Sequence, residues 1–171
     1  MGAARGMSDV AMLTLGTGVG GAAMVDGRLL KGNLGRAGHL GHMTVDFNGP
    51  LDDVGTPGSI ELEIGNKTVK ERSGGRFRAT RDMVEAHLAG DPEATALWSR
   101  SVKALGACIA SIANVLDPEA VIVGGGIAKA GDALFRPLER HLEAFEWRPG
   151  GARLRLLPPL LGDEEIGRAH V

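Results

Sequence analysis

The stretch Leu13–Gly21, LTLGTGVGG, holds the residues whose types and spacing most directly suggest ligand chemistry. Gly16, Thr17, Gly18 and Gly20 interrupt two apolar segments. Because glycine has no Cβ, the backbone can come close to a ligand, and the N–H groups of such a turn together with the Thr17 hydroxyl can hold a phosphate. A glycine-rich hairpin that binds nothing has the same short pattern, so this stretch alone leaves both interpretations open.

A second glycine cluster follows an apolar segment late in the chain. Residues 121–128, VIVGGGIA, place Gly124, Gly125 and Gly126 between a predicted strand and a predicted helix. A strand that ends in glycines at a helix N-terminus favours an anionic ligand and leaves it room. The alternative is a tight strand-to-helix turn without a ligand.

The elements that must position these turns are predicted from hydrophobic periodicity and turn residues. Apolar runs on both sides of the first turn predict a hairpin of Val10–Leu15 and the segment up to Asp26-Gly27, continued by Arg28–Leu30. Lys31–Gly41 is predicted as a loop, and alternation over His42–Asp46 predicts a third strand.

The second half alternates predicted helices with single strands. Ser59 and Thr80 are predicted caps of two helices, the second ending at Gly90, and residues 66–78 receive no assignment. Further predictions are a long amphipathic helix from Asp91-Pro92 to Leu116, a strand Ala120–Val123, a helix Ile127–Phe145 and a strand Arg153–Leu157. This order predicts an α/β fold with a mixed sheet and helices on its faces.

Composition limits the function classes. The 171 residues contain 43% hydrophobic and 23% charged residues, and the formal net charge is −2, which argues against direct nucleic-acid binding by this segment. The single cysteine, Cys108, lies in an apolar helical stretch and is predicted to be a buried, unreactive thiol. No apolar run is long enough for a membrane span and the first residues lack a secretory signal, so we expect a cytoplasmic protein without membrane contact.

Four motifs in their order along the chain resemble the ROK family (repressors, open reading frames and kinases). They are LGTGVGG, GRAGHLGHMTVD, GSIE and VIVGGGIA, and the resemblance extends from about Gly2 to Gly162. It implies the actin-like (ribonuclease H-like) ATPase fold and identifies residues 1–171 as the carboxy-terminal lobe of a sugar kinase. The family's amino-terminal lobe with its catalytic Asp has no counterpart in this sequence. Its closing helix is missing or replaced by the tail after Asp163.

The resemblance implies roles for both glycine clusters. Gly16, Thr17, Gly18 and Gly20 would face the phosphates of ATP, with which Mg²⁺ is expected. Gly124, Gly125 and Gly126 would leave room for the adenosine.

The resemblance also implies a sugar site, from His39, His42 and Glu61. The family pattern Gly-Glu-x-Gly-His corresponds to Gly38–His42, so His42 matches and His39 replaces a Glu. A carboxylate accepts two hydroxyl hydrogen bonds, whereas neutral imidazole has one donor and one acceptor, so the substrate is uncertain. The alternatives are a loop imidazole bonded to backbone for His39 and a first-turn helix charge for Glu61.

The family's structural zinc is not expected. Its cysteine positions correspond to Asp52, Val54 and Ser59, so His42 would have one carboxylate beside it, too few ligands for a closed tetrahedral site.

The main hypothesis is therefore ATP-dependent phosphorylation of a sugar, with this chain supplying the nucleotide site and part of the sugar site. No catalytic residue is assigned within it. The alternative is the sugar-sensing effector domain of a ROK-type transcriptional repressor, and a third interpretation is a nucleotide-binding fragment that dimerises without chemistry. A homodimer is implied by the resemblance.

Overall fold

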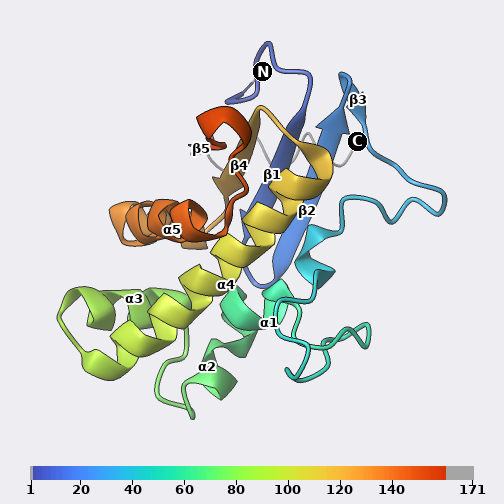
Figure 1. The fold of residues 1–171 in the computed structure, drawn as a ribbon. Coiled ribbons are helices and arrows are strands. Elements are labelled where there is room, and N and C mark those ends of the chain that lie inside the picture. Colours follow the sequence, from blue (N-terminus) through green and yellow to red (C-terminus); the bar gives the residue numbers. More distant parts are fainter. Residues whose placement is uncertain (1, 161–171) are drawn as a thin grey trace.

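The computed structural model describes residues 2–160, and its centre is a five-stranded mixed sheet (Figure 1). In space the strands follow the order β3-β2-β1-β4-β5. Their bounds are β1 Val10–Leu15, β2 Val19–Val25, β3 Arg28–Leu29, β4 Ala120–Gly124 and β5 Arg155–Leu157. The tail after Asp163, and Gly162 at the end of the resemblance, lie outside the described residues.

Strand pairing brings the two glycine turns to one edge of the sheet. β1 pairs antiparallel with β2, and it pairs in parallel with β4, where Thr14 lies opposite Gly124. Because parallel strands have their carboxyl ends at the same edge, the turn after Leu15 and the turn after Gly124 are neighbours. The sequence separates these turns by more than a hundred residues, and the β1–β4 pairing brings them together.

The helices follow the predicted order, with a long helix passing across the sheet (Figure 1). The α-helices are α1 Ile60–Ile64, α2 Val69–Arg72, α3 Thr80–Leu88, α4 Pro92–Leu116 and α5 Asp132–Phe145, and the 3₁₀ helices are η1 Leu40–His42, η2 Asn66–Thr68, η3 Ile127–Ala130 and η4 Pro149–Gly151. The Asp91 carboxylate accepts a hydrogen bond from the Ala94 N–H at 2.8 Å, and Asp117 ends α4 in the left-handed conformation. None of the helices within residues 2–160 is long and apolar enough to cross a membrane.

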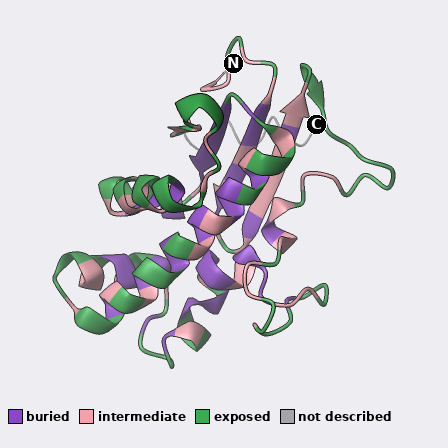
Figure 2. Cartoon of the chain, viewed as in Figure 1, coloured by how far each residue is buried: buried purple, intermediate pink, exposed green. Residues whose placement is uncertain are grey.

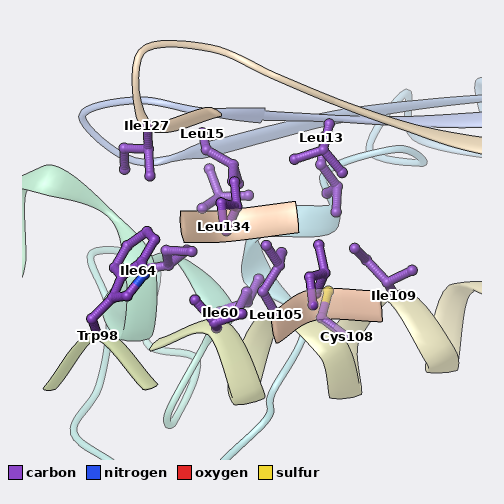
Figure 3. Packing of buried hydrophobic residues seen from close by; sticks show 14 of the residues in the cluster. Leu13, Leu15, Ile60, Ile64, Trp98, Leu105, Cys108, Ile109, Ile127 and Leu134 are labelled. Atoms are coloured by element: carbon purple, nitrogen blue, oxygen red, sulfur yellow. The ribbon is translucent and has the colours of Figure 1, made fainter. Parts of the chain in front are cut away.

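The hydrophobic core lies between the sheet and α1, α4 and α5 (Figures 2 and 3). Leu13 and Leu15 alternate along β1 toward the helices, and both are fully buried. Full burial of one such side chain contributes about 1.5–3 kcal/mol. Cys108 of α4 is buried here as predicted, and burial raises the pKa of its thiol to about 12.

One predicted strand was wrong, and one segment without a prediction contains helices. The segment His42–Asp46 is not a strand: η1 ends at His42, and Thr44 makes only an isolated bridge to Ser59. The alternation there reflects partial packing of a loop against the core. Residues 66–78, left unassigned, contain η2 and α2.

The helix ends also differ from the predictions. Ala79 is the N-cap of α3 and Thr80 is its first residue, while Ser59 occupies the N-cap of α1 without a side-chain capping bond. The predicted helix Ile127–Phe145 is divided into η3 and α5 at Gly131, where φ is +57°. A backbone with that φ cannot continue a right-handed helix.

Candidate functional site

The two glycine turns line one cleft of about 530 Å³. Gly16 and Thr17 come from the β1–β2 turn, and Gly126 comes from the turn after β4. Thr17 and Gly126 are exposed, so the cleft is open to solvent at both turns. The other residues that line it are Asn66, Ala79, Thr80, Arg81, Val84, Glu85, Leu88, Ile127, Lys129 and Ala130.

Gly125 lets the second turn pack directly on the end of β1. Its φ is +92°, and a Cβ there would collide with the Leu15 carbonyl oxygen and lie 2.7 Å from the Leu15 nitrogen. A side chain would therefore separate β4 from β1 at the edge where the cleft begins. Gly124, one residue earlier, is the buried last residue of β4.

The first turn is held by the segment that follows α1. The Asn66 N–H donates to the Gly16 carbonyl and the Lys67 N–H donates to the Thr17 carbonyl, each at 2.9 Å. Asn66 Oδ1 then accepts from the Thr80 N–H at 2.7 Å, at the start of α3. Hydrogen bonds therefore connect the turn, η2 and α3 into one wall.

The cleft combines an apolar wall with polar groups near its turns. Val84, Leu88 and Ile127 supply apolar surface, and the Thr80 hydroxyl is buried without a hydrogen-bond partner among the described residues. Such an arrangement can take a ligand with a flat apolar part and an anionic part. Sequence reasoning missed Asn66, Thr80 and this apolar wall, because only the fold brings α3 to the glycine turns.

Gly18 and Gly20 lie beside the cleft and are not among the residues that line it. A Cβ on Gly18 would collide with the Glu61 carboxylate, and one on Gly20 would lie 2.5 Å from Thr14 Oγ1. Glycine at these two positions therefore leaves the Glu61 carboxylate and the Thr14 hydroxyl in their present places.

Glu61 of α1 points its carboxylate at the first turn. Its Oε2 accepts from the Val19 N–H at 3.1 Å, and its Oε1 lies 2.7 Å from Lys67 Nζ. Lys67 Nζ also lies 2.6 Å from Asp53 Oδ2, and the hydrogen bonds with Asp53 and Glu61 raise the pKa of Lys67 above its usual range. Both oxygens of Glu61 therefore have donors within the protein.

His39 and His42 share a second cavity, of about 360 Å³, beside β2. His39 is exposed, and its Nδ1 lies 2.9 Å from the Arg36 carbonyl oxygen, the arrangement of the loop-imidazole alternative. His42 Nδ1 lies 2.8 Å from Asp52 Oδ2. Glu61 does not line this cavity, so the structure brings the two histidines together without the carboxylate.

The Asp52 carboxylate is buried under the loop that contains it. Burial alone would raise the pKa of this carboxyl, but hydrogen bonds from His42 and from the Thr56 and Val54 N–H groups outweigh burial and hold it well below its usual range. Asp52 is therefore an anion that accepts three hydrogen bonds.

The residues at the family's zinc positions do not fit that ion. The Asp52 carboxylate already accepts three hydrogen bonds, Val54 offers no donor atom, and Ser59 offers a hydroxyl where a thiolate is required. Within residues 2–160 no group of three or more His, Cys, Asp or Glu side chains is placed to hold a metal ion.

Comparison with known proteins identifies the family. A model described as the ROK family matches residues 1–165, so the chain belongs to the ROK family. An N-acetylmannosamine kinase of Vibrio cholerae serotype O1 is 36% identical over 152 residues, which cover 88% of this chain and 52% of the relative.

Solved structures give the same result. A ROK hexokinase from Thermus thermophilus superposes with a TM-score of 0.81 at 31% identity, covering 96% of this chain and 56% of that one. A ROK family glucokinase from Streptomyces griseus, in complex with glucose and AMPPNP, superposes with a TM-score of 0.80 at 28% identity, covering 98% and 59%. The predicted fold class, that of the actin-like ATPases, is confirmed. The chain spans about half the length of the curated relatives that it matches.

Proposed function

We propose that residues 1–171 form the carboxy-terminal lobe of an ATP-dependent sugar kinase, supplying the nucleotide site and part of the sugar site. The observation that carries this proposal is the shared cleft. Gly16 and Thr17 of the first turn and Gly126 of the second line the same cleft, as two turns that contact one nucleotide would. Related proteins that are named as sugar kinases support the reaction class.

In the nucleotide half, the first turn would take the phosphates and the apolar wall would take the base. The Thr17 hydroxyl and the backbone N–H groups of the turn are the donors for phosphate oxygens, although the Gly16 N–H already donates to the Gly18 carbonyl at 2.9 Å. Gly124 and Gly125 would act by keeping the second turn close to β1, and Gly18 and Gly20 by letting the first turn pack. The glucokinase solved with AMPPNP, an ATP analogue, supports this assignment.

In the sugar half, His42 and Glu61 are the proposed hydroxyl-binding residues, and the exposed His39 lines the same cavity as His42. His42 lines the 360 Å³ cavity, whereas Glu61 reaches a sugar only by sharing or releasing one of its present donors.

Phosphoryl transfer needs a sugar hydroxyl placed in line with the γ-phosphate and positive charge around the transferring oxygens. Mg²⁺ bound to ATP would supply part of that charge, and it is held largely by the phosphates and water in such sites. We assign no general base among these residues. The isolated chain is therefore expected to bind ligands without turning them over.

Calorimetric titration of ATP and of a panel of hexoses tests the proposal. We expect ATP to bind, and we expect Gly126→Val, which places a branched side chain in the cleft, to weaken ATP binding by tenfold or more without changing hexose binding. No Cβ contact within 4 Å exists at Gly126, so the substitution should not disturb folding. Ala96→Val, at an exposed position of α4, is the matched control for added bulk.

The outcomes separate the alternatives. Hexose binding without ATP binding would favour the sugar-sensing effector domain, and no binding of either ligand would favour a fragment without chemistry. If these 171 residues alone phosphorylated a sugar with ATP, our proposal that they do not contain the general base would be refuted. The homodimer and the cytoplasmic location stay predictions, the first testable by sedimentation.

A further inference from the structure

Asp52 makes contacts that no role described so far requires. Its side chain is 0% exposed, and its Oδ1 accepts from the Val54 N–H at 3.0 Å and from the Thr56 N–H at 2.8 Å. Its Oδ2 lies 2.8 Å from His42 Nδ1. One buried carboxylate therefore closes its own loop and holds a histidine ten residues away.

The loop around Asp52 is closed by backbone bonds as well. The Asp52 N–H donates to the Thr56 carbonyl at 2.9 Å, and the Gly55 N–H donates to the Asp52 carbonyl at 3.0 Å. Leu51 and Pro57 form a bridge at its base. This closure fixes the position of the carboxylate before any ligand arrives.

The contact with Asp52 determines which nitrogen of His42 carries a proton. A carboxylate only accepts hydrogen bonds, so Nδ1 must be the donor, and Nε2 of the neutral ring is then an acceptor. Among the described residues, Nε2 has no hydrogen-bond partner, and the His42 side chain is 31% exposed on the wall of the 360 Å³ cavity. The ring is thus held at one nitrogen and available at the other.

We propose that Asp52 is a positioning residue that acts in place of a metal ion. It fixes the orientation and the tautomer of His42, so that Nε2 presents a hydrogen-bond acceptor to a hydroxyl of the ligand in the cavity. The geometry of His42 and Asp52 stands without the proposed function, whereas the identity of the ligand as a hexose rests on it.

Nitrogen NMR of the full 171-residue chain, labelled at its five histidines, tests the proposal directly. His42→Gln assigns the signals. In mildly alkaline solution, where imidazole is generally neutral, we expect His42 to show the Nδ1–H tautomer. Asp52→Ala should shift the signals toward the mixture of tautomers found in free imidazole, and Asp52→Asn, which keeps an acceptor oxygen, should retain part of the Nδ1–H form.

Asp53→Asn is the matched control, because it removes the same charge at the next residue. The Asp53 side chain is 80% exposed and does not contact His42. It should leave the His42 signals unchanged. A wild-type spectrum with the Nε2–H tautomer would overturn the proposal, even if every Asp52 variant failed to fold. An unchanged tautomer in folded Asp52→Ala would overturn it equally.

Hexose calorimetry on the same variants separates the two claims. If the wild type binds a hexose, we expect Asp52→Ala to weaken binding about tenfold and Asp52→Asn to weaken it less. If the wild type binds no hexose but shows the expected tautomer, the proposed function fails while the positioning role stands. Unchanged hexose affinity in Asp52→Ala would refute that role in binding.

Discussion

The cleft at the two glycine turns and the cavity lined by His39 and His42 are built from different kinds of atoms. At the cleft, the contacts are between backbone atoms. Gly125 packs on the backbone of Leu15, and the Gly16 and Thr17 carbonyls accept hydrogen bonds from N–H groups of the segment after α1. At the cavity, side chains on a long loop make the contacts, chiefly His42 with Asp52.

This difference indicates which of the two regions tolerates amino-acid substitution. A close contact between two backbones excludes every side chain, so substitution at such a position disturbs the fold itself. A side-chain contact can be replaced by another with compatible donors and acceptors. We therefore expect substitutions to be tolerated better at the side-chain contacts of the loop than at the backbone contact of Gly125.

The largest expected effect is that of Gly125→Ala. The positive φ and the collision of the new Cβ with Leu15 act together, and we expect a loss of about 3 kcal/mol or more in the free energy of unfolding. Chemical denaturation measures it. Gly126→Ala makes the same change at the next residue, where φ is −60° and no atom lies within 4 Å of the new Cβ.

Gly126→Ala should be neutral or slightly stabilising, since alanine reduces the freedom of the unfolded chain. Equal stabilities of the two variants would show that the second turn does not pack on β1 as described.

The loss of the Asp52 carboxylate is expected to be the next largest effect. Asp52→Ala removes the acceptor for the Val54 and Thr56 N–H groups and for His42, so we expect a loss of about 2 kcal/mol. Urea unfolding at neutral pH measures it.

Acidification provides a second test of the same group. Because the folded-state pKa of Asp52 is lowered, its ionised form adds stability above the ordinary aspartate pKa, and this stability is lost as pH falls toward the folded-state value. The difference in unfolding free energy between wild type and Asp52→Asn should therefore shrink below about pH 4. A difference that does not depend on pH would contradict the low pKa.

The sequence predicted the fold where short-range patterns determine it. Strand β1, the hairpin and the limits of α4 follow from apolar periodicity, the Asp26-Gly27 turn, and Asp91-Pro92 before the helix. The meeting of Gly16 and Gly126 was expected only through the resemblance, because no local pattern specifies that β1 pairs with β4.

The structure and the contacts of the loop residues could not be predicted from the sequence. His42–Asp46 has strand-like alternation, but η1 ends at His42 and only an isolated bridge from Thr44 to Ser59 follows it. One carboxylate was expected beside His42. That the Asp52 carboxylate also closes its own loop, by accepting from the Thr56 and Val54 N–H groups, was not expected, because those contacts depend on the folded loop. Thr80, predicted as a cap, is the first residue of α3 after the N-cap Ala79, and its hydroxyl has no hydrogen-bond partner among residues 2–160.

The smallest expected effect separates the two neighbouring aspartates of the loop. Asp53→Asn breaks an ion pair with Lys67 whose acidic side is 80% exposed, and such pairs contribute at most about 1 kcal/mol and weaken with salt. We expect a loss in unfolding free energy below that value, vanishing in concentrated sodium chloride, whereas the loss in Asp52→Ala should persist there. An Asp53→Asn loss as large and as insensitive to salt as that of Asp52→Ala would mean that the loop is held through Lys67 and Glu61 rather than through His42.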